Sequence, residues 1–201
     1  VRPIRTLDGG AEINDVFFDD VRVPQANRVG EENKGWTYAK FLLGHERTSY
    51  ARIGGKRKQL AHIRKIASSV PDGGNRRLID DPAFERKLTE ATLAVDALEM
   101  TVLRVLSAVK DGGAPGKEAS IIKILATETA QQITTLYLDT AAQNGRRAFP
   151  DSVSPGWLEG GIATQHAAPG VSAYLGTRAQ SIYGGTNEIQ HNIIAKRVLG
   201  L

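Results

Sequence analysis

The stretch LTEATLAVDALEMTVLRVLSAV, residues 88–109 of a 201-residue chain, sets the fold class. Apolar residues recur in it at alternating spacings of three and four, which is the period of one buried face on an α-helix. Such a stripe is typical of a helix that packs against other helices. Its members are Leu88, Ala91, Val95, Leu98, Val102, Val105 and Val109. The segment Asp111-Gly112-Gly113 is expected to end this helix.

Two more long helices are predicted on either side of this one. The first runs from about Lys34 through Ile66, until Pro71-Asp72-Gly73-Gly74-Asn75 breaks the pattern. The second runs from about Lys117 to Ala142 and ends near Gly145. Both carry apolar residues at helical spacing, so both are expected to present one face to a shared core.

The C-terminal part is less regular. Residues 146–170 are rich in Pro, Gly and Ser and are expected to form a long surface loop. The helical pattern returns over Val171–Gln180 and over Asn187–Leu199, where Gly200 provides the stop. Long helices with short Gly-rich connections predict a mainly α fold, an up-and-down four-helix bundle whose fourth position the C-terminal segment fills.

The N-terminal part has a different pattern. Residues 11–24 combine β-branched and aromatic residues in partial alternation, and Pro24 ends the run, so they are predicted to form strand. This is too little β-structure for a stable sheet of its own. The segment is therefore expected to complete a larger sheet outside the chain, and a boundary is expected between residues 1–33 and 34–201.

Composition narrows the classes of protein. The chain is 41% hydrophobic and 24% charged, which indicates a globular protein, and it shows no bilayer-spanning apolar run and no leader. The absence of cysteine excludes disulfides and thiolate metal sites and is compatible with a reducing cytoplasm.

The charge balance of +4 favours an anionic partner. The densest basic run, Lys56-Arg57-Lys58, has no interleaved aromatic residues and continues a helical pattern. It is therefore interpreted as a solvated helix face, and neither a nucleic acid nor a membrane is expected as partner.

Residues Ile182–Gln190, IYGGTNEIQ, carry the strongest indication of a binding site. Two adjacent glycines allow positive φ and close approach of a ligand, and Thr186 or Asn187 can cap a following helix. Backbone N–H groups at such a helix start suit an anionic or carbonyl-bearing ligand. An ordinary junction between a loop and a helix is the alternative.

Four stretches in order resemble motifs of the acyl-CoA dehydrogenase family. They are Asp15–Pro24, then Val29-Gly30-Glu31 with Gly35-Trp36, then Leu42-Leu43-Gly44-His45-Glu46-Arg47, and finally Ile182–Leu201. The resemblance implies that residues 1–33 end the family's middle β domain and that residues 34–201 form its C-terminal helical bundle domain.

The resemblance also implies an activity. The family oxidises an acyl-CoA thioester to the trans-2-enoyl-CoA, in fatty acid β-oxidation among other routes. A carboxylate removes the α-proton while the β-hydrogen leaves as hydride to FAD. Electron-transfer flavoprotein is the expected electron acceptor, and a tetramer is the expected assembly. A carboxylate base suits this chemistry when burial raises its pKa above the ordinary value of a glutamate.

Many family members carry the base directly after the tyrosine of the C-terminal motif, where this chain has Gly184. A subset similar to the long-chain and isovaleryl enzymes places it in the first long helix, before an arginine. Glu46, followed by Arg47, matches that place and is the predicted base. A surface glutamate in an ion pair is the alternative, and Glu188 is a less favoured rival.

Further roles follow from the same resemblance. The backbone N–H of Gly184 is expected to polarise the thioester carbonyl. His45, Arg47 and Tyr183 are expected to contact the substrate, although Arg47 in a structural ion pair and Tyr183 in a core remain alternatives. The expected cofactor-binding residues are Gly185, Thr186, Asn187 and Glu188. Histidines 45, 62, 166 and 191 lack metal-ligand spacing, so no metal is predicted.

Two departures from the family bear on the assembly. The usual arginine and Phe-Gly segment, which reaches the FAD of a neighbouring subunit, has no counterpart between Arg76 and Glu90; Arg76, Arg77 and Arg86 are weak substitutes. The glycine-rich flavin stretch is reduced to Gln143–Arg146. These losses resemble bacterial heteromeric members, in particular large subunits named for pimeloyl-CoA oxidation.

Two alternatives to a dehydrogenase stay open. The chain could be a non-catalytic scaffold subunit of a heteromeric enzyme, or it could belong to an acyl-CoA oxidase or nitroalkane-oxidising relative with the same fold.

Overall fold

The computed structural model describes residues 1–46, 50–110, 119–141 and 162–201, except for the side chains of residues 43–46, 109–110 and 162–168. This part of the chain is mainly helical. A π-helical turn, Ala195–Leu199, continues the last helix. The helices are α1 Gly35–Glu46, α2 Ile53–Ala67, α3 Pro82–Lys110, α4 Ala119–Thr140, α5 Ile162–Arg178 and α6 Asn187–Ile194.

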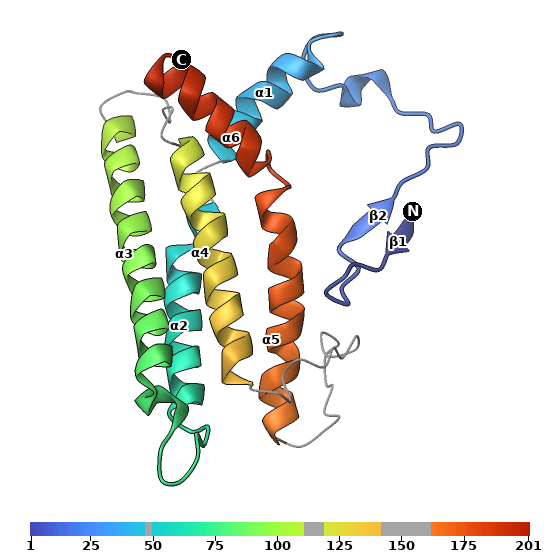
Figure 1. Ribbon diagram of the computed structural model, residues 1–201. Helices are drawn as coiled ribbons and strands as arrows, with labels where there is room; N and C mark the ends of the chain where they lie inside the picture. Colours follow the sequence, from blue (N-terminus) through green and yellow to red (C-terminus); the bar gives the residue numbers. More distant parts are fainter. Residues whose placement is uncertain (47–49, 111–118, 142–161) are drawn as a thin grey trace.

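Helices α2, α3, α4 and α5 lie side by side with alternating direction, as Figure 1 shows. Helix α4 packs against α2, α3 and α5, and α6 crosses the end of the bundle against α4. The predicted up-and-down four-helix bundle is therefore confirmed. The predicted helix stop at Asp111-Gly112-Gly113 lies outside the described residues.

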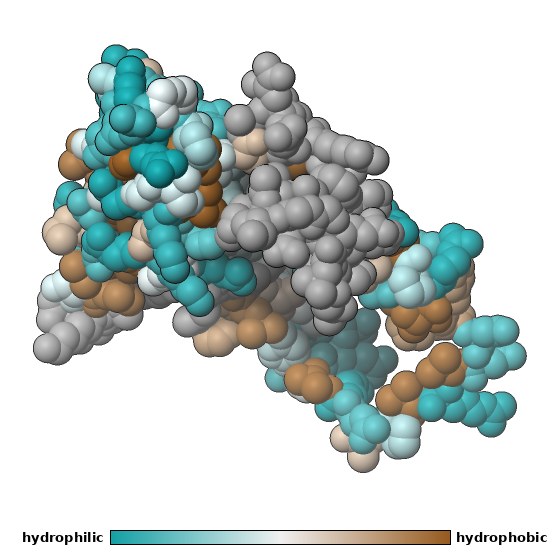
Figure 2. All heavy atoms as spheres, turned by 90° about the horizontal axis from the view of Figure 1, so that it is seen from below, coloured by the Kyte–Doolittle hydropathy of each residue, from teal (hydrophilic) through white to brown (hydrophobic). Residues whose placement is uncertain are grey.

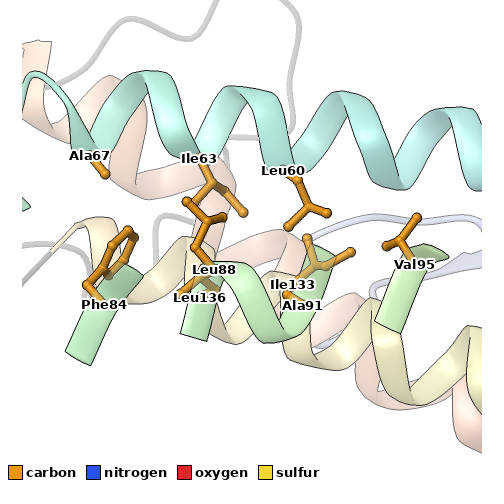
Figure 3. Close-up of a cluster of buried hydrophobic side chains, with 9 residues drawn as sticks. All are labelled: Leu60, Ile63, Ala67, Phe84, Leu88, Ala91, Val95, Ile133 and Leu136. Atoms are coloured by element: carbon orange, nitrogen blue, oxygen red, sulfur yellow. The ribbon is translucent and has the colours of Figure 1, made fainter. Parts of the chain in front are cut away.

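A hydrophobic core joins α2, α3 and α4 (Figure 3). Helix α3 contributes the stripe that the sequence predicted: Leu88, Ala91, Val95 and Leu98 are each at most 1% exposed. Burial of such side chains is worth roughly 1.5–3 kcal/mol each, which makes this stripe a main source of bundle stability. The full cluster is Leu60, Ile63, Ala67, Phe84, Leu88, Ala91, Val95, Ile133 and Leu136.

The prediction of one continuous helix over 34–66 is wrong. Helix α1 ends at Glu46 and α2 begins at Ile53, and Arg52 between them has a left-handed backbone with φ 40° and ψ 45°. A left-handed residue cannot continue a right-handed helix, so the chain changes direction there and enters the bundle. Periodicity missed the break because the apolar spacing carries on across it.

The predicted loop over 146–170 is wrong for its last part, because α5 begins at Ile162 and contains Pro169. Hydrogen bonds join the C-terminal end of α5 to α4. The Oγ1 atoms of Thr134 and Thr177 are 2.9 Å apart, and Arg178 Nη2 donates to the Gln131 carbonyl at 3.3 Å. The first part of α5 was predicted as loop because it contains Pro169 and follows a stretch rich in Pro and Gly. The Gln143–Arg146 stretch lies outside the described residues.

The strand prediction over 11–24 is correct only for a short part. β1 Arg2–Ile4 pairs antiparallel with β2 Ile13–Asp15, and residues 16–24 form no strand. Phe17 and Phe18 are 67% and 81% exposed. Figure 2 shows hydrophobic side chains on the arm that extends from the bundle. Residues 16–24 have no described partner strand with which to form β-sheet hydrogen bonds. The expected larger sheet and the expected domain boundary therefore stay predictions.

None of the described helices is long and apolar enough to cross a bilayer.

We predict that Leu88→Ala lowers the free energy of unfolding by about 2–5 kcal/mol, because it opens a cavity in the core cluster. Leu93→Ala, at a position 60% exposed in the same helix, is the matched control and should cost less than about 1 kcal/mol. Urea denaturation followed by far-UV circular dichroism measures both. Equal losses would contradict the assignment of the buried face.

Candidate active site

The C-terminal turn requires its two glycines. Gly184 and Gly185 have φ values of 67° and 91°, which L side chains rarely adopt. A Cβ atom at Gly184 would collide with the Tyr50 hydroxyl, and one at Gly185 would lie 2.6 Å from Gln190 Nε2. Gln190 is 1% exposed, and its Nε2 donates to the Gly185 carbonyl at 3.3 Å. The turn is therefore supported from both sides by side chains that occupy the space of a Cβ atom.

The contact between Gly184 and Tyr50 joins the two segments that carry the predicted site. Tyr50 follows Glu46, the last residue of α1, by four positions. Tyr50 and Tyr183 also line one pocket. The structure thus brings Tyr50, four positions after the end of α1, next to the C-terminal turn. The side chains of His45 and Glu46, and all of Arg47, lie outside the described residues.

The start of α6 is capped as the sequence predicted. Thr186 is the N-cap, and its Oγ1 accepts a hydrogen bond from the Ile189 N–H at 3.3 Å. The backbone N–H of Glu188 and the Thr186 hydroxyl hold the pKa of the exposed Glu188 carboxyl below its ordinary value. An ionised carboxylate therefore stands at the helix start, where it complements the helix dipole.

Asn187 is held from inside by a residue that sequence reasoning missed. Lys123 of α4 is fully buried, and its Nζ donates to Asn187 Oδ1 at 2.8 Å. The Thr127 hydroxyl donates to the same oxygen at 3.3 Å. Burial lowers the pKa of Lys123, and the nearby Glu188 carboxylate partly offsets that effect. The sequence signal for this role is a lysine on a face of α4 whose other residues are mostly apolar or small.

A pocket of about 420 Å³ opens beside the turn, between the start of α2, the middle of α4 and the end of α5. Its charged lining residues are Arg52 and Lys56. Lys56 is only 5% exposed, so the predicted solvated face is wrong for this residue, although Arg57 and Lys58 are exposed. The cause is the left-handed turn at Arg52, which begins α2 with Lys56 facing inward.

The electrostatics of the pocket are set by burial. Lys56 Nζ donates to the Ala51 carbonyl at 2.9 Å. Burial, with a smaller contribution from Arg52, lowers the pKa of Lys56 to about 8. Burial also raises the pKa of the half-exposed Tyr183 phenol, which therefore stays neutral and can donate a hydrogen bond.

The three arginines considered as substitutes for the family's FAD-contacting arginine do not line this pocket. Arg76 and Arg77 lie in the connection between α2 and α3, at the opposite end of the bundle from α6 (Figure 1), and Arg86 is in the first part of α3. Within the described ranges, no three His, Cys, Asp or Glu residues gather as a metal site would require.

A sequence profile described as "Acyl-CoA dehydrogenase, C-terminal domain" matches residues 33–199. The chain belongs to the acyl-CoA dehydrogenase family. It is 33% identical over 203 residues to acyl-CoA dehydrogenase IpdE1 of Mycobacterium tuberculosis, covering 100% of this chain and 47% of that protein.

Solved structures share the fold of this chain. The ChsE4-ChsE5 complex from Mycobacterium tuberculosis matches with a TM-score of 0.71 and 30% identity, covering 92% of this chain and 45% of the other. The Tcur3481-Tcur3483 steroid enzyme matches with a TM-score of 0.75 and 25% identity, covering 99% and 48%. The chain thus spans about half the length of the curated relatives it matches.

We predict that Lys123→Met and Asn187→Ala are coupled in stability by about 1–2 kcal/mol, because either change removes the same charge-assisted hydrogen bond. A double-mutant cycle measured by urea denaturation gives this coupling. The pair Lys65→Met and Asn187→Ala, with Lys65 exposed on α2, should be additive. An additive result for Lys123 as well would mean that the bond does not hold α6.

We predict that stability rises with pH between about 8 and 10.5, the folded and ordinary pKa values of Lys56. In this window the unfolded chain binds the proton that the folded chain has lost, so raising the pH favours the folded state by up to about 3 kcal/mol. Lys56→Met should flatten this rise, and Lys58→Met, on the exposed face, should leave it. Chemical denaturation across this pH range measures both, and equal slopes in all three proteins would contradict the burial of Lys56.

Proposed function

We propose that this chain is the helical part of an FAD-dependent enzyme that converts an acyl-CoA thioester to the trans-2-enoyl-CoA. The observation that carries the proposal is the contact between Gly184 and Tyr50. This contact joins the C-terminal turn, whose glycines are exposed, to the segment that follows α1 and its last residue, Glu46. In this proposal a thioester carbonyl lies at the turn and the Glu46 carboxylate reaches the adjacent α-carbon.

Glu46 is the proposed base. The Tyr50 hydroxyl occupies the space that a side chain at position 184 would need, so the C-terminal turn cannot supply a carboxylate there without displacing Tyr50. Glu46 takes the α-proton, and the Gly184 N–H donates to the thioester carbonyl, which acidifies that proton. His45, Arg47 and Tyr183 line the substrate site in this proposal.

FAD is the proposed cofactor, and when bound it supplies the acceptor for the β-hydrogen as hydride. The residues present fit such a group: Gly184 and Gly185 are exposed and carry no side chain, and Thr186 and Glu188 stand at the open start of α6. Since Glu188 is ionised, this end suits hydroxyl or amino groups such as those of ribose and adenine better than a phosphate. The Asn187 side-chain oxygen is already bonded to α4 and supports the turn.

The proposed assembly is a tetramer, either homomeric or heteromeric. Electron-transfer flavoprotein is the proposed electron acceptor. The proposed role is in fatty acid β-oxidation in the cytoplasm. The exposed apolar residues Phe17, Phe18 and Trp36 leave surface for the remainder of the enzyme to cover. ChsE4-ChsE5 is a complex of two named chains, which supports a second subunit type.

We predict that Glu46→Gln slows anaerobic flavin reduction by an acyl-CoA about 10²–10⁴-fold while flavin stays bound, because the base is lost and the shape is kept. The measurement uses the full-length protein, co-expressed with its partner subunit, and a panel of acyl-CoAs. Glu90→Gln, exposed on α3, is the comparison and should keep a reduction rate close to that of the wild type.

Unchanged reduction in Glu46→Gln would move the base elsewhere and favour the scaffold alternative. Direct oxygen consumption with peroxide release would favour the oxidase alternative.

A further inference from the structure

The turn between β1 and β2 lies against the bundle. Thr6, Asp8, Gly9 and Gly10 in this turn are partly buried, whereas the other residues among the first fourteen are exposed. Figure 1 shows the turn beside the middle of α5. The contact joins segments 164 residues apart in the sequence. It therefore attaches the N-terminal arm, residues 1–33, to the helical part of the chain.

Asp8 builds this turn from within. Its Oδ1 accepts hydrogen bonds from the Thr6 hydroxyl and from the Gly10 N–H, the latter at 3.1 Å. The Thr6 N–H donates to the Gly10 carbonyl at 2.8 Å and closes the turn. The bond from the Thr6 hydroxyl, above all, holds the pKa of the Asp8 carboxyl below its ordinary value. The carboxylate is therefore ionised, and it cannot swing away without breaking two hydrogen bonds.

Helix α5 receives the turn at Ser172 and Gly176, which lie on one face of the helix because they are four residues apart. The Ser172 hydroxyl donates to the Asp8 carbonyl. A Cβ atom at Gly176 would lie 2.9 Å from Asp8 Oδ2, which is too close for a methyl group. The Asp8 carboxylate thus occupies space that only a glycine leaves free on α5.

Gly176 is required by the arm and not by the bundle. The three atoms nearest to a Cβ atom at this position all belong to Asp8. At Gly170, in the same helix, a Cβ atom would meet the Tyr137 ring at 3.5–3.6 Å, which is ordinary van der Waals contact. Glycine inside a helix lowers stability relative to alanine. The close approach of Asp8 is the contact that alanine at position 176 would lose.

The contact lies at the edge of the candidate site. Thr177, the residue after Gly176, lines the same pocket as Tyr183. Burial raises the pKa of the Tyr183 phenol, Arg52 lowers it, and Glu12 raises it. Glu12 follows the turn by two residues, so the attached arm carries a carboxylate within electrostatic reach of Tyr183.

We propose that Asp8 and Gly176 are positioning residues, which attach the N-terminal arm to α5 and so fix the surroundings of Tyr183 in the substrate site. The attachment follows from a glycine that only the arm requires. Its effect on the substrate rests on the proposed function, in which Tyr183 lines the substrate site.

The first test is hydrogen exchange, measured by mass spectrometry on the full-length protein with its partner subunit. Gly176→Ala should raise the exchange rates of residues 2–15 about tenfold or more, because the added methyl group displaces the Asp8 carboxylate. Gly170→Ala is the matched control and should leave these rates unchanged. Urea denaturation followed by far-UV circular dichroism should show both variants to be as stable as the wild type or more stable.

The second test is anaerobic flavin reduction over a range of acyl-CoA concentrations. Gly176→Ala should raise KM about threefold to tenfold with little change in kcat, because the surroundings of Tyr183 change whereas Glu46 and the Gly184 N–H stay in place. Asp8→Asn keeps the size of the side chain and an acceptor oxygen, so it should retain both the slow exchange and the KM of the wild type.

A double-mutant cycle separates this contact from general loosening. Asp8→Ala and Gly176→Ala disrupt the same contact, so the double variant should exchange no faster in residues 2–15 than the faster of the two single variants. Gly170→Ala added to Asp8→Ala should likewise change nothing, because Gly170 takes no part in the contact.

Unchanged exchange in Gly176→Ala, or additive effects of Asp8→Ala and Gly176→Ala, would overturn the attachment. Faster exchange with an unchanged KM would overturn the positioning role. If the wild type reduced no flavin with any acyl-CoA while Gly176→Ala still released the arm, the proposed dehydrogenation would fail and the attachment would stand.

Discussion

The hydrogen bond from the buried Lys123 ammonium to Asn187 Oδ1, 2.8 Å long, fixes the start of α6 to α4. The rest of the candidate site depends on it. With α6 in place, Gln190 can support Gly185 and the turn can place Gly184 against Tyr50. A charged donor makes this bond stronger than one between neutral groups, and its burial shields it from water.

Helix α4 can hold this position because its faces pack differently. Its apolar side chains pack against α2 and α3: Ile133 and Leu136 belong to the core cluster, and Ile122 belongs to a second cluster with Leu98 and Val105 of α3. Its threonines bond to α5 and α6, where Thr134 meets Thr177 and Thr127 meets Asn187. The apolar packing supplies stability, and the hydrogen bonds fix which residues lie opposite one another. The site is therefore built on the most buried helix of the bundle.

The bundle could be predicted from the sequence because a buried helical face leaves a regular apolar period, as Leu88 to Val105 does. The turn could be predicted because Gly184, Gly185 and the Thr186 cap are local features. Helix α5 was predicted only from Val171 onward, because Pro169 and the Pro- and Gly-rich stretch before it indicate a loop. The break at Arg52, the role of Lys123 and the burial of Lys56 all depend on contacts between distant segments, which leave no local pattern.

The two buried lysines differ in a way that bears on their roles. Lys123 points its charge at an amide oxygen of its own chain, so its cost is met within the fold and its effect is structural. Within the described part of the chain, Lys56 bonds to the carbonyl of Ala51, and it lines a pocket together with Arg52. An apolar residue of similar size would fill the Lys56 position at lower cost to the folded state. A cation that lowers stability while facing an open pocket is better explained by what the pocket binds than by the needs of the fold.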